Sequence, residues 1–175
     1  MSSRWLLLLG LLSACAARVA APPHAAALPA LDVVTLEGQA TSLKAALGGS
    51  VAVLDLWATW CTACQREHPK LERLQAAYAE QGLRVVGLDV GETPEVVRAY
   101  LAENRLSFPV YLDPEFRVAD ALGDNQLPTL LLVDREGRIL RRSAALDQAM
   151  LEALKAALGA APSTDGASHD ARAGQ

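Results

Sequence analysis

Two long apolar runs flank a helical segment near the middle of the chain. Residues 51–56 and 83–90 are almost continuously apolar, which is typical of strands buried on both faces of a parallel sheet. Residues 61–81 between them have the periodicity of an amphipathic helix, and Gly82 supplies a stop. The apolar face of this helix consists of Leu71, Leu74 and Tyr78. Strand, helix and strand predict a right-handed βαβ unit with a parallel sheet.

Pro69 lies inside the predicted helix and should kink it, because proline lacks an amide donor. The same patterns predict the other elements of the chain. These are a strand within 31–36, a helical turn over 42–47, a helix opened by Thr93 and Pro94, a strand over 108–112, a helical stretch over 113–122, an antiparallel hairpin over 130–133 and 138–142, and a last helix over 147–158. The helix that follows Pro94 should bury Val96, Val97, Tyr100 and Leu101.

The first residues have the pattern of a secretory signal. Arg4 precedes an apolar run, and residues 5–17 number only 13, against roughly 20 needed to cross a bilayer. Leu12-Ser13-Ala14-Cys15 resembles the lipobox of bacterial lipoproteins, which implies that Cys15 is acylated and becomes the mature N-terminus. The alternative is ordinary cleavage further along, with Cys15 discarded. The resemblance places the protein in the cell envelope, lipid-anchored and facing the periplasm or exterior.

These patterns divide the chain into four parts. We expect a lipoprotein-type signal peptide over 1–14, an Ala/Pro-rich tether over 15–28, a folded domain over 29–159 and a disordered tail over 160–175. Hydrophobic residues make up 51% of the chain and charged residues 21%, as in an ordinary globular protein. The net charge is −4 with no basic run, which argues against nucleic acid as a partner.

The number and spacing of the cysteines indicate a chemical role, not a structural one. Apart from Cys15, the cysteines are Cys61 and Cys64, and the loop that they would close is too short to staple a fold. A thiol at a helix N-terminus is stabilised as thiolate, so Cys61 is the expected nucleophile. Cys64, one turn further on, is the expected resolving thiol. The pair therefore predicts a redox-active disulfide with no further cofactor.

Two other functions remain as alternatives. A metal-binding chaperone would use Cys61 and Cys64 together with a further Cys or His. The histidines are His24 in the tether, His169 in the tail and His68, which we assign to the surface. A peroxiredoxin-like antioxidant peroxidase would need a Pro-x-x-x-Thr-x-x-Cys run, which this sequence lacks.

Asp55 is a carboxylate within an apolar strand. Burial there should raise its pKa, so that it could take a proton from Cys64. The alternative is a strand-end aspartate that reaches solvent.

The motif Trp57-Ala58-Thr59-Trp60-Cys61-x-x-Cys64-x-x-Glu67-x-Pro69 is similar to that of exported, membrane-tethered thiol-disulfide reductases of the TlpA/ResA/DsbE type. The resemblance covers about residues 29–158. It implies an α/β thioredoxin fold, in which a central mixed sheet is flanked by helices. Residues 90–113 resemble the insertion that separates the TlpA type from plain thioredoxin.

The resemblance also assigns roles to residues around the thiols. Asp55 matches the buried aspartate of thioredoxins, although ResA-type relatives often carry a neutral residue there. Glu67 would tune the thiol pKa or relay protons, the alternative being an exposed helix carboxylate. Trp60 would cover the thiols at the surface, whereas Trp57 belongs to the core. Ala63 departs from the family, where proline usually precedes the second cysteine, and leaves the reduction potential and the direction of electron flow open.

Pro128 is similar to the cis-proline that faces the disulfide in this fold. A cis bond would expose the backbone of Leu127 for strand-like pairing with a substrate and crowd out a metal. The alternative is a trans proline that starts a strand.

The resemblance implies a monomeric lipoprotein that reduces disulfides in other proteins. A membrane electron donor of the DsbD/CcdA kind would recharge it. Cytochrome c maturation is the process suggested most, and general disulfide reduction in the envelope is the alternative.

Overall fold

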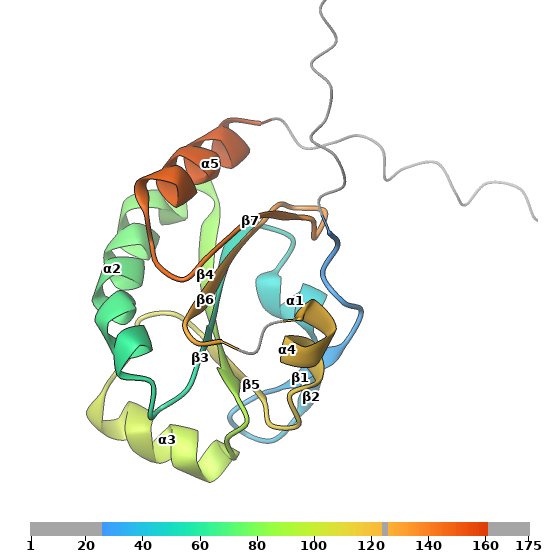
Figure 1. Ribbon diagram of the computed structural model, residues 1–175, viewed down its shortest axis with the longest axis vertical. Coiled ribbons are helices and arrows are strands. Elements are labelled where there is room, and N and C mark those ends of the chain that lie inside the picture. The colour runs from blue at the N-terminus through green and yellow to red at the C-terminus, as the bar shows by residue number, and fades with distance from the viewer. Residues whose placement is uncertain (1–25, 124–125, 161–175) are drawn as a thin grey trace, which may run out of the picture.

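In the computed structural model, residues 26–123 and 126–160 are described, and they form one mixed sheet with helices on both faces (Figure 1). The strands are β1 (Asp32–Val34), β2 (Ala40–Ser42), β3 (Val51–Trp57), β4 (Leu83–Val90), β5 (Val110–Asp113), β6 (Thr129–Val133) and β7 (Ile139–Ser143). The helices are α1 (Leu43–Leu47), α2 (Thr62–Tyr78), the short 3-10 helix η1 (Ala79–Gln81), α3 (Pro94–Glu103), α4 (Arg117–Leu122) and α5 (Gln148–Gly159). The predicted signal peptide with Cys15, and the tail beyond residue 160, lie outside the described residues.

The sheet has seven strands in the order β2-β1-β5-β4-β3-β6-β7. β3 lies between β4, which is parallel to it, and β6, which is antiparallel. All seven residues of β3 are buried, because helices cover both faces of the sheet at this point. The predicted parallel βαβ unit and mixed sheet are therefore confirmed.

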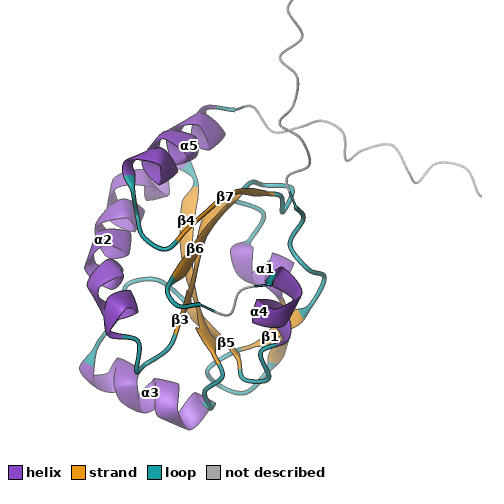
Figure 2. Cartoon of the chain, in the orientation of Figure 1, coloured by secondary structure: helices purple, strands orange, loops and turns teal. Residues whose placement is uncertain are grey.

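The two faces of the sheet are covered by different helices (Figure 2). α1 and α4 pack on one face, where they meet Leu54 and Leu56 of β3. α2 and α5 pack on the other, where they meet Val51 and Val53. Side chains alternate along a strand with a period of two, so the apolar run 51–56 supplies both cores at once. Trp57, the last residue of β3, lies in a third cluster, which also contains both cysteines of the motif and Val97 of α3.

Several predicted boundaries differ from the structure for local reasons. α2 begins at Thr62, one residue later than predicted, because Cys61 is its N-cap. β5 begins at Val110, since Pro109 has no amide hydrogen to pair with a neighbouring strand. β2 was not predicted at all, because a three-residue edge strand lacks apolar alternation.

Val96 is not part of the buried face of α3, contrary to the prediction. Its side chain is 46% exposed, whereas Val97 is fully buried. Successive residues of a helix point about 100° apart, so the face that turns Val97 and Tyr100 toward Trp57 leaves Val96 outside.

The first described residues pair with the domain. The carbonyl of Ala26 accepts a hydrogen bond from the amide of Ile139 at 2.8 Å, and the amide of Leu28 donates to the carbonyl of Gly137 at 2.9 Å. Backbone pairing thus reaches into the segment expected to be the tether. Among the described helices, none is both long and apolar enough to cross a membrane.

Gly87 of β4 makes room for the third cluster. A Cβ atom built on Gly87 would lie 3.1 Å from Nε1 of Trp57 and 3.4 Å from ring and methyl carbons of Phe108 and Val110. A side chain here would push the Trp57 indole out of its position against the sheet.

Gly87→Ala should therefore lower the free energy of unfolding by about 1–3 kcal/mol, the usual cost of overpacking a core. Urea titration followed by circular dichroism measures this change. Gly159→Ala is the matched control, because a Cβ there has no neighbour within 4 Å. A Gly87 variant as stable as the Gly159 variant would show that the indole moves without penalty.

Candidate functional site

The two cysteines of the motif lie where β3 passes into α2. Cys61 and Cys64 are joined by a disulfide, with an S–S distance of 2.05 Å. Cys61 is the N-cap of α2, and its Sγ accepts a hydrogen bond from the Cys64 amide at 3.2 Å. Cys61 is 6% exposed, whereas Cys64 is completely buried. The more accessible sulfur therefore lies at the N-terminus of a helix and accepts one backbone hydrogen bond there, an arrangement that favours a thiolate.

The surface around the disulfide combines an exposed aromatic ring and a proline turn. Trp60 directly precedes Cys61 and is 69% exposed, whereas Trp57 is fully buried, as predicted for each. The Leu127–Pro128 peptide bond is cis, again as predicted. Leu127 packs against the cluster that contains both cysteines, so the turn before β6 lies against the same cluster as the disulfide.

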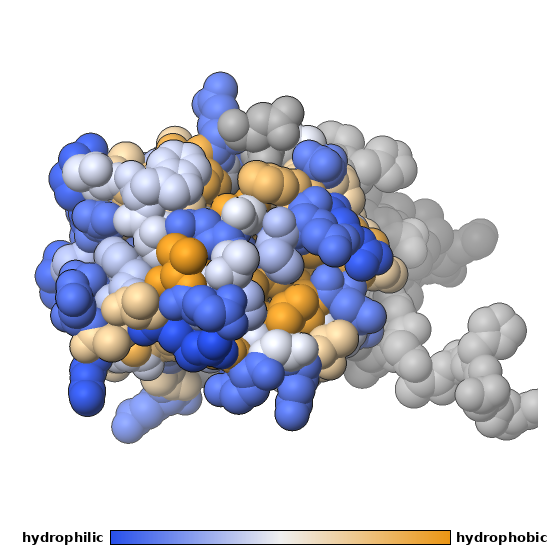
Figure 3. Space-filling view, turned by 90° about the horizontal axis from the view of Figure 1, so that it is seen from below, coloured by the Kyte–Doolittle hydropathy of each residue, from blue (hydrophilic) through white to orange (hydrophobic). Residues whose placement is uncertain are grey.

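The face of the molecule at the lower end of Figure 1 includes the turn from β3 to α2. Seen from this end, apolar residues form small separate groups among polar ones (Figure 3). The exposed apolar side chains at this end are therefore interspersed with polar ones.

Asp55 lies within β3, two residues before Trp57, and is completely buried. Its Oδ2 atom is 3.3 Å from Nε2 of His68. Within the part of the chain that the structure describes, neither carboxylate oxygen has a well-directed hydrogen-bond donor. The pKa of Asp55 is raised overall, because the effect of burial outweighs the opposite effect of the nearby His68, and the charge of Glu67 adds to the rise. The solvent-exposed alternative for Asp55 is wrong.

His68 is the main correction to the sequence prediction. We assigned it to the surface, but it is only 3% exposed and lies on the buried side of α2. Its ring packs edge-on against Trp57, with ring centroids 4.8 Å apart, and approaches Phe108 at 6.2 Å. The spacing from Cys64 to His68 is four residues, so the two share one face of the helix. This spacing could have predicted that His68 is buried, but we assigned it to the surface because histidine is polar.

Glu67 is buried as well, so its reading as an exposed carboxylate is wrong. One oxygen accepts a hydrogen bond from the Leu146 amide at 3.1 Å, and the other is 2.7 Å from Nζ of Lys70. The contact with Leu146 joins α2 to the segment that leads into α5, whereas Lys70 lies one turn further along α2. Both oxygens of Glu67 are occupied, so its carboxylate is fixed in place.

Glu92 supports the turn before Cys61 and lies near the buried Asp89, and the sequence analysis missed both residues. The two oxygens of Glu92 accept hydrogen bonds from the Thr59 amide at 2.5 Å and the Thr59 hydroxyl at 2.7 Å. Asp89 is completely buried on β4, opposite Trp57. Burial and the neighbouring Glu92 raise the pKa of Asp89 to about 8. Asp89 interrupts an apolar strand as Asp55 does, and this pattern could have identified it as a buried carboxyl group.

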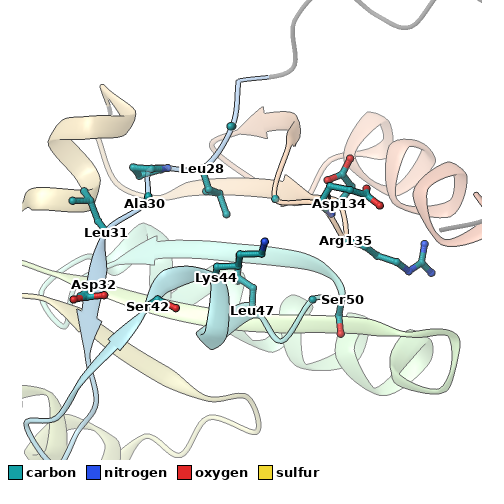
Figure 4. A pocket seen from close by; sticks show the side chains of 15 residues that line it. Leu28, Ala30, Leu31, Asp32, Ser42, Lys44, Leu47, Ser50, Asp134 and Arg135 are labelled. Carbon is teal, nitrogen blue, oxygen red and sulfur yellow. Dashed lines mark hydrogen bonds between the residues drawn. The ribbon is translucent and has the colours of Figure 1, made fainter. Parts of the chain in front are cut away.

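A pocket of about 430 Å³ lies at the opposite end of the sheet (Figure 4). Its lining includes Ser50, just before β3, and Asp134, just after the antiparallel β6. Leu28 and Lys44 extend into the space from opposite sides. Since Cys61 follows the other end of β3, this pocket is separate from the disulfide. No group of three or more His, Cys, Asp or Glu side chains suited to a metal occurs within 26–123 and 126–160.

The raised pKa of Asp89 makes folding stability depend on pH. The folded protein holds this proton up to about pH 8, whereas the unfolded chain loses it near the ordinary value of 3.8. Stability contributed by the protonated group is therefore complete below the unfolded pKa and is lost as pH rises toward 8.

Asp89→Asn removes this titration. We expect the variant to gain about 1–3 kcal/mol over the natural chain between roughly pH 5 and pH 8, measured by urea unfolding. The control is Asp32→Asn, which makes the same substitution at an exposed position. A constant difference for Asp89→Asn would show that Asp89 is ionised in the folded protein.

Comparison with known proteins agrees with this geometry. A profile described as the AhpC/TSA family matches residues 24–142. The thiol-disulfide oxidoreductase ResA of Bacillus thuringiensis (strain Al Hakam) is 33% identical over 114 residues, which are 65% of each chain. ResA of Halalkalibacterium halodurans is 35% identical over 106 residues, 61% of this chain and 60% of the relative. The chain thus spans a little under two thirds of the length of these curated relatives.

A solved structure gives the same result for the fold. A thiol:disulfide interchange protein of the DsbE kind from Chlorobium tepidum is 28% identical, with a TM-score of 0.68. The match covers 76% of this chain and 96% of that one. The chain therefore belongs to the AhpC/TSA family, and its thioredoxin-like fold is of the TlpA/ResA/DsbE type.

Proposed function

We propose that this protein is a thiol-disulfide oxidoreductase that reduces disulfides in other proteins. The observation that carries the proposal is the disulfide at the N-terminus of α2, with Cys61 near the surface and Cys64 buried behind it. This asymmetry gives the two sulfurs different tasks, because only the accessible one can meet a substrate.

In the first step, the Cys61 thiolate attacks one sulfur of a substrate disulfide. The substrate bond breaks, one substrate thiolate leaves, and a mixed disulfide joins Cys61 to the other substrate sulfur. The Cys64 amide donates to the Cys61 sulfur and stabilises its negative charge before the attack.

In the second step, Cys64 gives up its proton, and its sulfur attacks Cys61. The bond between Cys61 and the substrate breaks, and the electron pair leaves with the substrate sulfur. Two electrons have then passed from the two thiols to the substrate disulfide. Asp55 is the proposed acceptor of the Cys64 proton, because burial raises its pKa toward the range in which it can exchange protons.

The other residues around the disulfide hold the substrate or adjust the charge. Trp60 offers an exposed ring for apolar groups of the substrate, and the backbone of Leu127 beside the cis-proline Pro128 is placed for strand-like pairing. Glu67 acts as a fixed negative charge near Asp55, because Lys70 and the Leu146 amide engage both of its oxygens.

The cell envelope is the proposed location. Arg4, the short apolar run and the lipobox-like sequence ending at Cys15 support export and lipid anchoring. A membrane donor of the DsbD/CcdA kind would return the disulfide to two thiols. Apocytochrome c is the substrate that the resemblance favours, and Ala63 makes the reduction potential a quantity to measure.

Single cysteine substitutions test the assigned roles. Cys61→Ser should abolish reduction of protein disulfides, because the attacking sulfur is gone. Cys64→Ser should accumulate mixed disulfides with partner proteins, visible as reducible high-mass species on gels and identifiable by mass spectrometry. Retention of full activity by both variants would contradict the proposal, whereas copper or zinc binding that Cys64→Ser abolishes would favour a metal-binding chaperone.

The lipid anchor has its own test. Cys15→Ser should move the protein from the membrane fraction of the expressing cell to the soluble fraction of the envelope, because an acyl chain is lost. Mass spectrometry of the natural chain should show a lipidated cysteine at the mature N-terminus. A mature chain that starts after residue 15 would contradict acylation and leave the redox proposal untouched.

A further inference from the structure

Asp55 and His68 form a buried pair of polar groups behind the disulfide. Asp55 is completely buried and His68 is 3% exposed, with 3.3 Å between Oδ2 and Nε2. Among the described residues, neither of these atoms has a well-directed hydrogen-bond partner, and their contact with each other is an ion-pair distance only. Unsatisfied buried polar groups destabilise a fold, so they tend to persist where function requires them.

The pair lies close to the proposed resolving thiol. Cys64 and His68 are four residues apart on the buried face of α2, and such residues are neighbours along a helix. The Asp55 side chain approaches this face from β3, and Trp57 of the same strand contacts the His68 ring. Cys64 is completely buried, so its proton needs an acceptor inside the protein, and His68 of this pair lies on the same buried face of α2.

The effect of His68 on the pKa of Asp55 is opposite to that of the other groups around this carboxyl. Burial and Glu67 of α2 both raise the pKa of Asp55, whereas His68 lowers it. The strand neighbours opposite Asp55 are Gly87 of β4 and Leu130 of β6, which carry no charge. Asp89, two residues further along β4, holds its own proton up to about pH 8 because its pKa is raised.

We propose that His68 is a positioning residue for proton transfer, and that the Asp55–His68 pair as a unit accepts the proton of Cys64. This inference rests on the proposed thiol-disulfide exchange and names a further residue for its second step. The Oδ2 atom of Asp55 and the Nε2 atom of His68 are 3.3 Å apart, close enough for a proton to pass from one group to the other.

The step balances with the pair as acceptor. Cys64 transfers its proton to the pair, its sulfur bonds to Cys61, and the substrate sulfur leaves with the electrons of the broken bond. When a donor later reduces the disulfide, the pair returns the proton to Cys64. Without the imidazole, Asp55 would keep a proton of its own to higher pH and could not accept another.

Two substitutions separate the imidazole's chemistry from its shape. His68→Phe keeps a planar ring between Trp57 and Phe108 but removes the nitrogen that faces Asp55. His68→Gln restores an N–H donor that does not titrate. Arg66→Gln, an exposed position on the same turn, is the matched control.

The resolving step is measured with Ellman's reagent. Reduced protein forms a mixed disulfide with thionitrobenzoate at Cys61, and Cys64 then releases the dye. For His68→Phe we expect about tenfold slower release at neutral pH and a rise of about one unit in the pH at which release becomes fast. His68→Gln should recover part of this loss, and Arg66→Gln should behave like the natural chain.

Coupling to Asp55 is tested by combining substitutions. In an Asp55→Asn background, His68→Phe should cause no further slowing, because the group through which it acts is gone. Equal slowing in both backgrounds would overturn the proposal, since a purely structural effect would be independent of Asp55.

A measurement without substrate separates this proposal from the proposed function. Carbon-13 NMR of the Asp55 carboxyl in the reduced protein should show a higher apparent pKa in His68→Phe. If that rise occurs but the natural chain reduces no protein disulfide, the function fails and the pair stands. If neither this pKa nor dye release changes, the pair fails and thiol-disulfide exchange stands. If circular dichroism shows that His68→Phe does not fold, His68→Gln tests the proposal instead. The same two measurements, the pKa of Asp55 and the rate of dye release, should then shift in the same direction by smaller amounts.

Discussion

The turn from β3 into α2 is the constraint on which the site depends. β3 is paired with β4 over all seven residues and with β6 over 52–56, so two neighbouring strands set the position at which the chain leaves the sheet, four residues before Cys61. α2 starts at the residue after Cys61, and the Cys64 amide in its first turn donates a hydrogen bond to the Cys61 sulfur. Backbone groups at a helix N-terminus provide the partial positive charge that stabilises a thiolate at this position.

Several acidic side chains lie around this turn, and the charge of each is balanced in a different way. Asp55 is paired with His68, Glu67 with Lys70 and a backbone amide, and Glu92 with Thr59. Asp89 has a pKa raised to about 8 and is therefore neutral near pH 7. This neutrality matters, because an ionised Asp89 beside Glu92 would place two like charges within a low-dielectric core. The sheet can therefore hold several carboxyl groups near the disulfide without a large uncompensated charge.

The order of the main elements could be read from hydrophobic periodicity, because β3, β4, α2 and α5 are long and strongly patterned. The cysteine pair could be found in the same way, since its spacing and the preceding strand are local features. Short edge elements such as β2 could not, because three residues leave no pattern. His68 was misplaced by polarity, although its spacing from Cys64 already set it on the inner face of α2.

The sequence by itself determined the βαβ unit, the N-terminal position of Cys61 on a helix and the burial of an aspartate in β3. These features follow from spacing within one segment. Only the tertiary structure decided which groups meet, because the pairs join residues from different elements. One example is the pair Asp55 and His68, from β3 and α2. Another is the pair Thr59 and Glu92, which are separated by 33 residues in the sequence. Composition cannot reveal such contacts, since packing brings a strand, a helix face and a loop together only after the sheet has formed.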